Sequence, residues 1–192
     1  LCTVAGLAAA TAATLPHLLS ITMDLTSFLP LLAVCAPLVH PDTASALVAA
    51  ESSFNRFAIG VVGGRLERQP RGLAEALATA RRLTDRGWNF SVGLGQINVG
   101  NFSRLGLDLT TAFDPCQNLA AMQTVLCECY ERAGSEGTSG QISLRRALSC
   151  YYSGNFNTGL RDGYVRRVAA QVPIPSLGIS PVALQPNTKD PS

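Results

Sequence analysis

The stretch SALVAAESSFN, residues 45–55, has the spacing of a helix with a glutamate on its apolar side. Ala44, Leu47, Glu51 and Phe54 recur at intervals of three and four residues, which predicts one stripe of an α-helix ending near residues 54–55. Glu51 is the only carboxylate of the stretch. An ionised carboxylate on an apolar face is costly, so such a group pairs with a cation or takes up a proton.

The length and charge of the chain limit the classes of protein it can belong to. Its 192 residues are enough for one well-buried domain, its formal net charge is +2, and Lys189 is its only lysine. Because the basic residues neither form runs nor alternate with aromatic residues, we expect no nucleic-acid partner. We also expect a monomer.

The two ends of the chain differ from the middle in composition. Residues 1–27 include an apolar stretch that proline and polar residues interrupt, and they lack the basic start of a secretory signal. We therefore separate them as an N-terminal segment, either a signal or a misassigned start. Residues 172–192 are rich in proline, which is typical of a tail. The folded domain is expected at residues 28–171.

Helical patterns dominate this middle part and predict a mainly α fold. The first helix follows His40 and Pro41, with Asp42 or Thr43 as its N-cap. Further helices are predicted at residues 73–86, 116–133, 144–152 and, as a short amphipathic piece, 163–171. Between them we expect a short hairpin or irregular loop at 58–70, an ordered loop leading into a short helix at 88–101, and a flexible link at 134–140.

The six cysteines indicate disulfides better than a metal site. The spacing of Cys127 and Cys129 is too tight for paired zinc ligands, and only His17 and His40 could complete such a site. We therefore expect disulfides formed in an oxidising compartment. Neither a metal nor a cofactor is expected.

Three separated segments together resemble the soluble lytic transglycosylases, whose fold is that of goose-type lysozyme. They are Glu51-Ser52, SVGLGQIN at residues 91–98 and ALSCYYSG at residues 147–154. Each is weak alone, but their order and spacing make the set specific. The resemblance implies a lysozyme-like domain of mainly α (α+β) class, with a substrate cleft.

Five shorter motifs narrow the resemblance to the transglycosylase subunit of type IV secretion systems. They are Cys35-Ala-Pro, residues 58–64, residues 87–91, Phe113-Asp-Pro-Cys and residues 149–155. The likeness extends over about residues 28–170. It implies an enzyme in the periplasm of a Gram-negative bacterium, with peptidoglycan glycan strands as substrate and secretion-channel subunits as partners.

The resemblance gives Glu51 the role of catalytic acid. A carboxyl group holds a proton near neutral pH only where desolvation raises its pKa, and an apolar stripe offers such a place. Lytic transglycosylases use one acid, because the 6-hydroxyl of N-acetylmuramic acid attacks its own anomeric carbon and gives a 1,6-anhydro sugar. The alternative is that Glu51 caps its helix or pairs with an arginine such as Arg56.

The other site residues follow from the same resemblance. Gly93, Leu94 and Gln96 are expected to line the cleft, with Gln96 offering a donor and an acceptor to the sugar, and Asn98 is a neighbour.

Two adjacent tyrosines complete the expected site. Tyr151 occupies the position of the family tyrosine whose hydroxyl bonds to the catalytic carboxylate. Tyr152 replaces a residue that is commonly Asn in the wider family. It could stack on a sugar or lie in the core, and the sequence favours neither.

We predict that Cys35 pairs with Cys116 and that Cys129 pairs with Cys150, which leaves Cys127 and Cys2 over. Sequence alone does not establish this connectivity.

Two other functions remain open at this point. One is a lysozyme-type hydrolase of the same fold, with Asp85, Glu67 or Glu75 as the second carboxylate. The other is a glycan-binding assembly module without chemistry.

Overall fold

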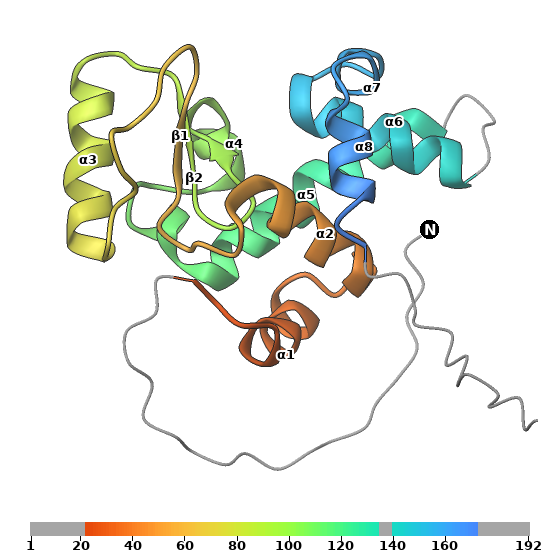
Figure 1. The fold of residues 1–192 in the computed structure, drawn as a ribbon, viewed down its shortest axis with the longest axis horizontal. Coiled ribbons are helices and arrows are strands. Elements are labelled where there is room, and N and C mark those ends of the chain that lie inside the picture. Colours follow the sequence, from red (N-terminus) through yellow and green to blue (C-terminus); the bar gives the residue numbers. More distant parts are fainter. Residues whose placement is uncertain (1–21, 135–139, 173–192) are drawn as a thin grey trace, which may run out of the picture.

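The chain folds into helices around a small antiparallel sheet, as shown in Figure 1 by a computed structural model that describes residues 22–134 and 140–172. The predicted mainly α class is confirmed. The helices are α1 (Leu25–Cys35), α2 (Pro41–Ser52), α3 (Leu73–Asp85), α4 (Phe102–Leu105), α5 (Pro115–Gly134), α6 (Gly140–Ser153), α7 (Thr158–Arg161) and α8 (Tyr164–Ala169). The strands are β1 (Ile59–Val61), β2 (Phe90–Val92) and β3 (Ile97–Asn98), and the 3-10 turns are η1 (Val99–Asn101) and η2 (Thr111–Phe113).

Helix α5 is the central support of the fold. It lies between the part that holds the sheet, α3 and α4 and the part formed by α6, α7 and α8 (Figure 1). Its buried residues include Leu119 and Met122, and these belong to one apolar core with Phe28 of α1 and Leu47 of α2. The disulfide between Cys35 and Cys116 joins α1 to the first turn of α5, with the two Cα atoms 5.1 Å apart. This predicted pairing is confirmed.

Helix α2 ends earlier than the apolar stripe predicts. Ser53 takes a left-handed conformation with φ of 50°, so the helix stops at Ser52 and Phe54 lies outside it. The Phe54 ring instead packs edge-on against Phe28, with ring centroids 5.1 Å apart. At the other end His40 is the N-cap, because its side chain accepts a hydrogen bond from the backbone nitrogen of Asp42. The expectation of Asp42 or Thr43 as cap is wrong.

The sheet forms where the sequence predicts loops. Strand β1 pairs with β2 rather than forming a hairpin within residues 58–70, and β2 pairs with β3 inside the expected loop 88–101. Ile59 faces Val92 and Ser91 faces Asn98 across these ladders. Strands of two or three residues are too short to show an alternating pattern, so the sequence does not reveal them.

The longer predicted helices are present, since α3, α5, α6 and α8 match the expected ranges within a few residues. Helix α1 begins at Leu25, before the domain start expected at 28, and neither it nor α7 was predicted. Much of the expected link at 134–140 and nearly all of the expected tail lie outside the described residues. Within the described ranges, the structure has no helix of the length and apolar character needed to cross a bilayer.

Candidate active site

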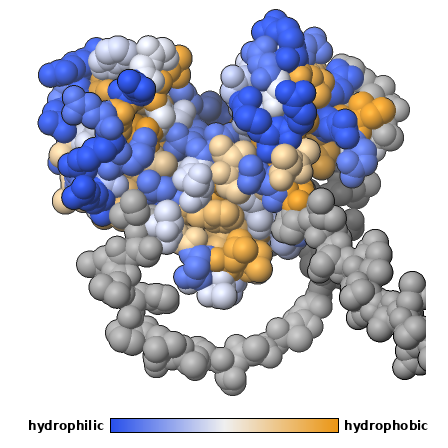
Figure 2. Space-filling model, viewed as in Figure 1, coloured by the Kyte–Doolittle hydropathy of each residue, from blue (hydrophilic) through white to orange (hydrophobic). Residues whose placement is uncertain are grey.

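A cavity of about 570 Å³ lies between the sheet and the end of α6, and Glu51 lines it. Figure 2 shows the surface hollowed between the part that carries the sheet and the part formed by α6–α8. The cavity is bounded by Glu51 of α2, Val125 of α5, residues of the sheet and of the segments next to its strands, and residues at the end of α6. The sheet side comprises Gly60, Val61, Val62, Asn89, Ser91, Gln96, Ile97, Asn98 and Asn101, and the α6 side comprises Tyr151, Tyr152, Ser153 and Gly154. The structure therefore brings five of the predicted site residues to one cavity.

Glu51 sits in a place that favours its protonated form. Burial raises the pKa of this carboxyl from 4.5 to about 7, while a hydrogen bond from Tyr164 and the nearby charge of Arg167 act in the opposite direction. Among the described residues no ion pair joins Glu51 to Arg56, so the alternative of such a pair is wrong. The Arg56 guanidinium instead lies over the Phe57 ring, 5.1 Å from its centroid.

Tyr164, and not Tyr151 as the resemblance implies, holds the Glu51 carboxyl. The Tyr164 hydroxyl donates a hydrogen bond to Oε1 of Glu51, and the side chain is only 3% exposed at the start of α8. The pKa of Tyr164 is raised by burial and by the adjacent carboxyl, so its proton stays on the oxygen. In the sequence, only the position of Tyr164 on the apolar side of the amphipathic segment predicted at residues 163–171 could have identified it.

Tyr151 holds the glycine-rich loop instead. Its hydroxyl donates a hydrogen bond of 2.5 Å to the carbonyl oxygen of Gly95, and its ring lines the cavity. A Cβ atom at Gly95 would lie 3.1 Å from that hydroxyl and 2.9 Å from Cβ of Met122. The loop therefore approaches α5 and α6 this closely only because residue 95 has no side chain.

Gly93 and Leu94 are buried and are not among the described residues that line the cavity. Leu94 is fully buried in the core. Gly93 has a φ of 79°, and a Cβ there would fall 2.2 Å from Nδ2 of Asn118. Neither residue is thus in the described cavity wall as expected, because Leu94 is buried in the core and Gly93 lies against Asn118 of α5.

Asn118 fixes that turn, and sequence reasoning missed it. The side chain is fully buried on α5, its Oδ1 accepts a hydrogen bond of 2.7 Å from the nitrogen of Gly95, and its Nδ2 donates to the carbonyls of Val92 and Ala112 at 3.0 and 2.8 Å. One side chain thus satisfies three backbone groups of the sheet, the loop and η2. A polar residue amid the apolar positions of a helix was the signal that could have identified it.

Gln96 lines the cavity but offers it less than expected. Its Nε2 donates to the carbonyl oxygens of Ala58 and Gly93, at 3.1 and 2.9 Å, which uses both hydrogens of the amide nitrogen. Its Oε1 lies against Gly60, where a Cβ would be only 2.7 Å away. Only the acceptor remains for a ligand, and the expected donor is engaged with the backbone.

Asn98 belongs to a polar wall on the sheet side. Its Nδ2 donates to Oδ1 of Asn89 at 2.7 Å and to Oγ of Ser91 at 3.3 Å, while its Oδ1 accepts from the nitrogen of Gly100. These three cavity-lining side chains are thereby ordered relative to one another.

Tyr152 stacks on the tyrosine that holds Glu51. The ring centroids of Tyr152 and Tyr164 are 4.5 Å apart, and the angle between the ring planes is 16°. Tyr152 lines the cavity and remains 46% exposed, so it is not a core residue. Contact of its ring with a sugar stays a prediction.

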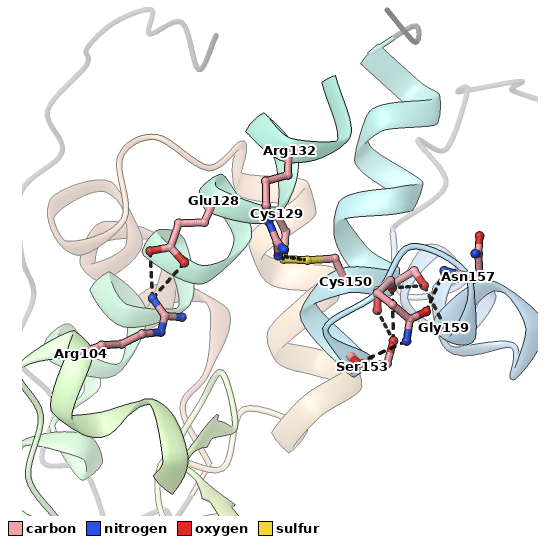
Figure 3. The surroundings of a disulfide bond; sticks show 10 residues. Arg104, Glu128, Cys129, Arg132, Cys150, Ser153, Asn157 and Gly159 are labelled. Carbon is pink, nitrogen blue, oxygen red and sulfur yellow. Dashed lines mark hydrogen bonds and ion pairs between the residues drawn. A yellow bond between two sulfur atoms is a disulfide. The ribbon is translucent and has the colours of Figure 1, made fainter. Parts of the chain in front are cut away.

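The second disulfide anchors the helix that carries both cavity tyrosines. Cys129 of α5 is bonded to Cys150 of α6, as predicted, with the Cα atoms 5.8 Å apart (Figure 3). Beside it the Arg132 guanidinium donates to Sγ of Cys150. Cys127 belongs to neither disulfide, and Cys2 lies outside the described residues.

The positions of the acidic side chains decide whether the described cavity holds one carboxyl group or a pair. Of the described residues that line the cavity, Glu51 is the only acid; Asp85, Glu67 and Glu75 do not border it. Glu75 is paired with Arg68 at 2.5 Å on the surface. Within the described ranges no group of three His, Cys, Asp or Glu side chains could hold a metal ion.

A desolvated carboxyl that lines a cleft has the properties that acid catalysis of glycosidic bond cleavage requires. The chain belongs to the transglycosylase SLT domain family, which matches residues 32–171, and is a lytic transglycosylase.

Similar proteins place it more narrowly within that family. The chain is 44% identical over 173 residues to the type IV secretion system protein virB1 of Brucella suis biovar 1, covering 85% of this chain and 71% of the relative. It is 38% identical over 151 residues to the protein virB1 of Agrobacterium fabrum, covering 77% of this chain and 60% of the relative. No solved structure matches the chain.

Proposed function

We propose that the enzyme cleaves the β-1,4 bond between N-acetylmuramic acid and N-acetylglucosamine in peptidoglycan and leaves a 1,6-anhydro end. The observation that carries this proposal is the single raised-pKa acid of the cavity. A hydrolase of the usual kinds needs a second carboxylate, either as nucleophile or to activate water. A substrate that supplies its own nucleophile needs only one acid, and this agrees with the described cavity.

In the proposed reaction Glu51 acts twice. Its carboxyl first gives its proton to the bridging oxygen, which leaves with the N-acetylglucosamine side as the bond to the anomeric carbon breaks. The 2-acetamido group assists as an oxazolinium-like intermediate. The oxygen of the 6-hydroxyl then bonds to the anomeric carbon as the acetamido oxygen leaves it, and the hydroxyl proton passes to the Glu51 carboxylate. Glu51 ends as it began, and no water is consumed.

The substrate contacts are proposed for the side chains of the cavity wall. The free Oε1 of Gln96 accepts from an acetamido or peptide N–H, and Asn98 and Tyr151 border the bound sugar. Gly93 and Leu94 act through the shape of the loop.

Digestion of purified peptidoglycan tests the chemistry. The wild-type chain should release muropeptides with anhydro ends, and products heavier by one water would indicate a hydrolase instead. Glu51→Gln should release neither. Glu75→Gln is the matched control, because Glu75 is paired with Arg68 and does not line the cavity, so its loss should leave the release rate unchanged.

We further propose that the enzyme works in the periplasm and opens the wall locally for a type IV secretion channel, with channel subunits as partners. The likeness to the two virB1 proteins supports this role. In the host bacterium, deletion of the chain should lower the transfer of a secreted reporter. Wild type should restore the transfer and Glu51→Gln should not; full restoration by the variant would separate the secretion role from wall cleavage.

A further inference from the structure

We propose that Tyr152 is a positioning residue, whose ring holds the ring of Tyr164 in the place from which the Tyr164 hydroxyl reaches Glu51. The inference rests on the proposed role of Glu51 as the acid. It assigns to the second tyrosine of α6 a task separate from that of Tyr151, which is bonded to the glycine-rich loop.

The stacking geometry supports this assignment. The two rings are nearly parallel at 4.5 Å, and Tyr152 is much more exposed than Tyr164, so Tyr152 lies on the side of the stack that faces the cavity. A phenol can turn its hydroxyl hydrogen, but the place of its oxygen is set by what packs against the ring. A face-to-face contact restrains the tilt of the ring and hence the position of the hydroxyl relative to Oε1 of Glu51.

The two helices that carry the stacked rings differ in length and in covalent anchoring. Tyr164 is the first residue of α8, which has only six residues and follows Gly163 at a φ of 75°. So short a helix has little stability of its own. Tyr152 lies on α6, which has 14 residues and is bonded to α5 through Cys150, two positions before it. The stack therefore joins the disulfide-bonded helix α6 to a short helix whose position depends on what packs against it.

The groups that act on the Glu51 carboxyl are few. Among the described residues they are Tyr164 and Arg167 on α8, and the nearby Tyr151 on α6 has its own pKa raised by burial and then by the Glu51 charge. The sheet residues that share the cavity bring no titratable side chain. A change in the pH profile after substitution of Tyr152 would therefore report a change in how Tyr164 meets Glu51.

The test measures release of anhydro-muropeptides against pH for the full chain and its Tyr152 variants. Tyr152→Phe keeps the stacked ring and should stay within about twofold of wild type, with the same alkaline limb. Tyr152→Leu keeps apolar cover without the stack and should lower kcat about tenfold with little change in KM. Its alkaline limb should move to higher pH, because the weakened hydrogen bond from Tyr164 is one that lowers the pKa of Glu51.

A double-mutant cycle makes the test specific. If Tyr152 acts through the Tyr164 hydroxyl, Tyr152→Leu should cost little in a Tyr164→Phe background. Tyr152→Met serves as a second variant should the leucine form fail to fold. Additive losses, or equal profiles for the phenylalanine and leucine variants, overturn the inference, and so does a change in KM alone, which would indicate sugar stacking. Absence of anhydro product from wild type would instead overturn the proposed function.

Discussion

Replacing Glu51 by glutamine should stabilise the fold at alkaline pH while it abolishes catalysis. The substitution removes the titrating group but keeps the shape of the side chain. An amide oxygen can still accept the hydrogen bond from Tyr164. What changes is the cost of placing a negative charge where burial favours the neutral form.

The size of the effect follows from the pKa of Glu51. It rises from 4.5 to about 7 on folding, and each pKa unit corresponds to about 1.36 kcal/mol. Because the folded-state value is the higher one, the stability that this group contributes is fully present below pH 4.5 and is lost as pH rises through about 7. The advantage of the variant over wild type should thus grow by about 3 kcal/mol between these limits.

Urea unfolding of the oxidised proteins, followed by circular dichroism at a series of pH values, measures this difference. In thermal unfolding, the same difference of about 3 kcal/mol corresponds, for a domain of this size, to a shift in Tm of roughly 6–12 °C. Comparing variant with wild type at each pH removes the titration of all other groups.

Glu75→Gln is the control with the opposite sign. The pKa of Glu75 is lowered by its hydrogen bond with Arg68, so that variant should lose stability at neutral pH and recover relative to wild type in acid. A Glu51→Gln advantage that does not change with pH would refute the reasoning, since it would mean that the folded chain does not favour the protonated carboxyl.

Three further predictions concern the supports of the site. Tyr164→Phe should lower the rate of anhydro release and move its alkaline limb upward, because the lost hydrogen bond lowers the pKa of Glu51; an unchanged pH profile would contradict this. Gly93→Ala should cost at least about 2 kcal/mol more in urea unfolding than Gly63→Ala, because both positions have positive φ but only Gly93 would place its Cβ against Asn118. Opening the α1–α5 disulfide, which closes 81 residues, should cost about 1 kcal/mol more than opening the α5–α6 disulfide, which closes 21; equal losses would show that chain entropy does not decide the difference.

What the sequence could predict is what depends on near neighbours or on the family resemblance. The helical stripe places Glu51 on the apolar side because residues three and four apart share a face. The length of α5 follows from the same periodicity. The two disulfides and the gathering of Gln96, Asn98 and Tyr151 around Glu51 are long-range features, and the motifs that resemble the family were needed to anticipate them.

What the sequence could not predict is which of several equivalent groups makes a given contact. Tyr151 and Tyr164 carry the same hydroxyl, and the choice between them depends on how α8 packs against α2. The Nε2 group of Gln96 likewise donates to two backbone carbonyl oxygens, and the positions of these oxygens depend on the turn at Gly93. The sequence does not predict the sheet for a related reason, because β1 pairs with a strand about thirty residues further along the chain.

The two tyrosine hydroxyls cannot exchange their roles, because each has a single proton to donate. Tyr151 gives its proton to the carbonyl of Gly95, and that carbonyl belongs to the loop which Asn118 holds from the other side. A Tyr151 that turned toward Glu51 would leave this buried carbonyl without its donor, at a cost of about 1–3 kcal/mol. The hydroxyl at the carboxyl is therefore a second one, and Tyr164 supplies it from 113 residues further along the chain than Glu51.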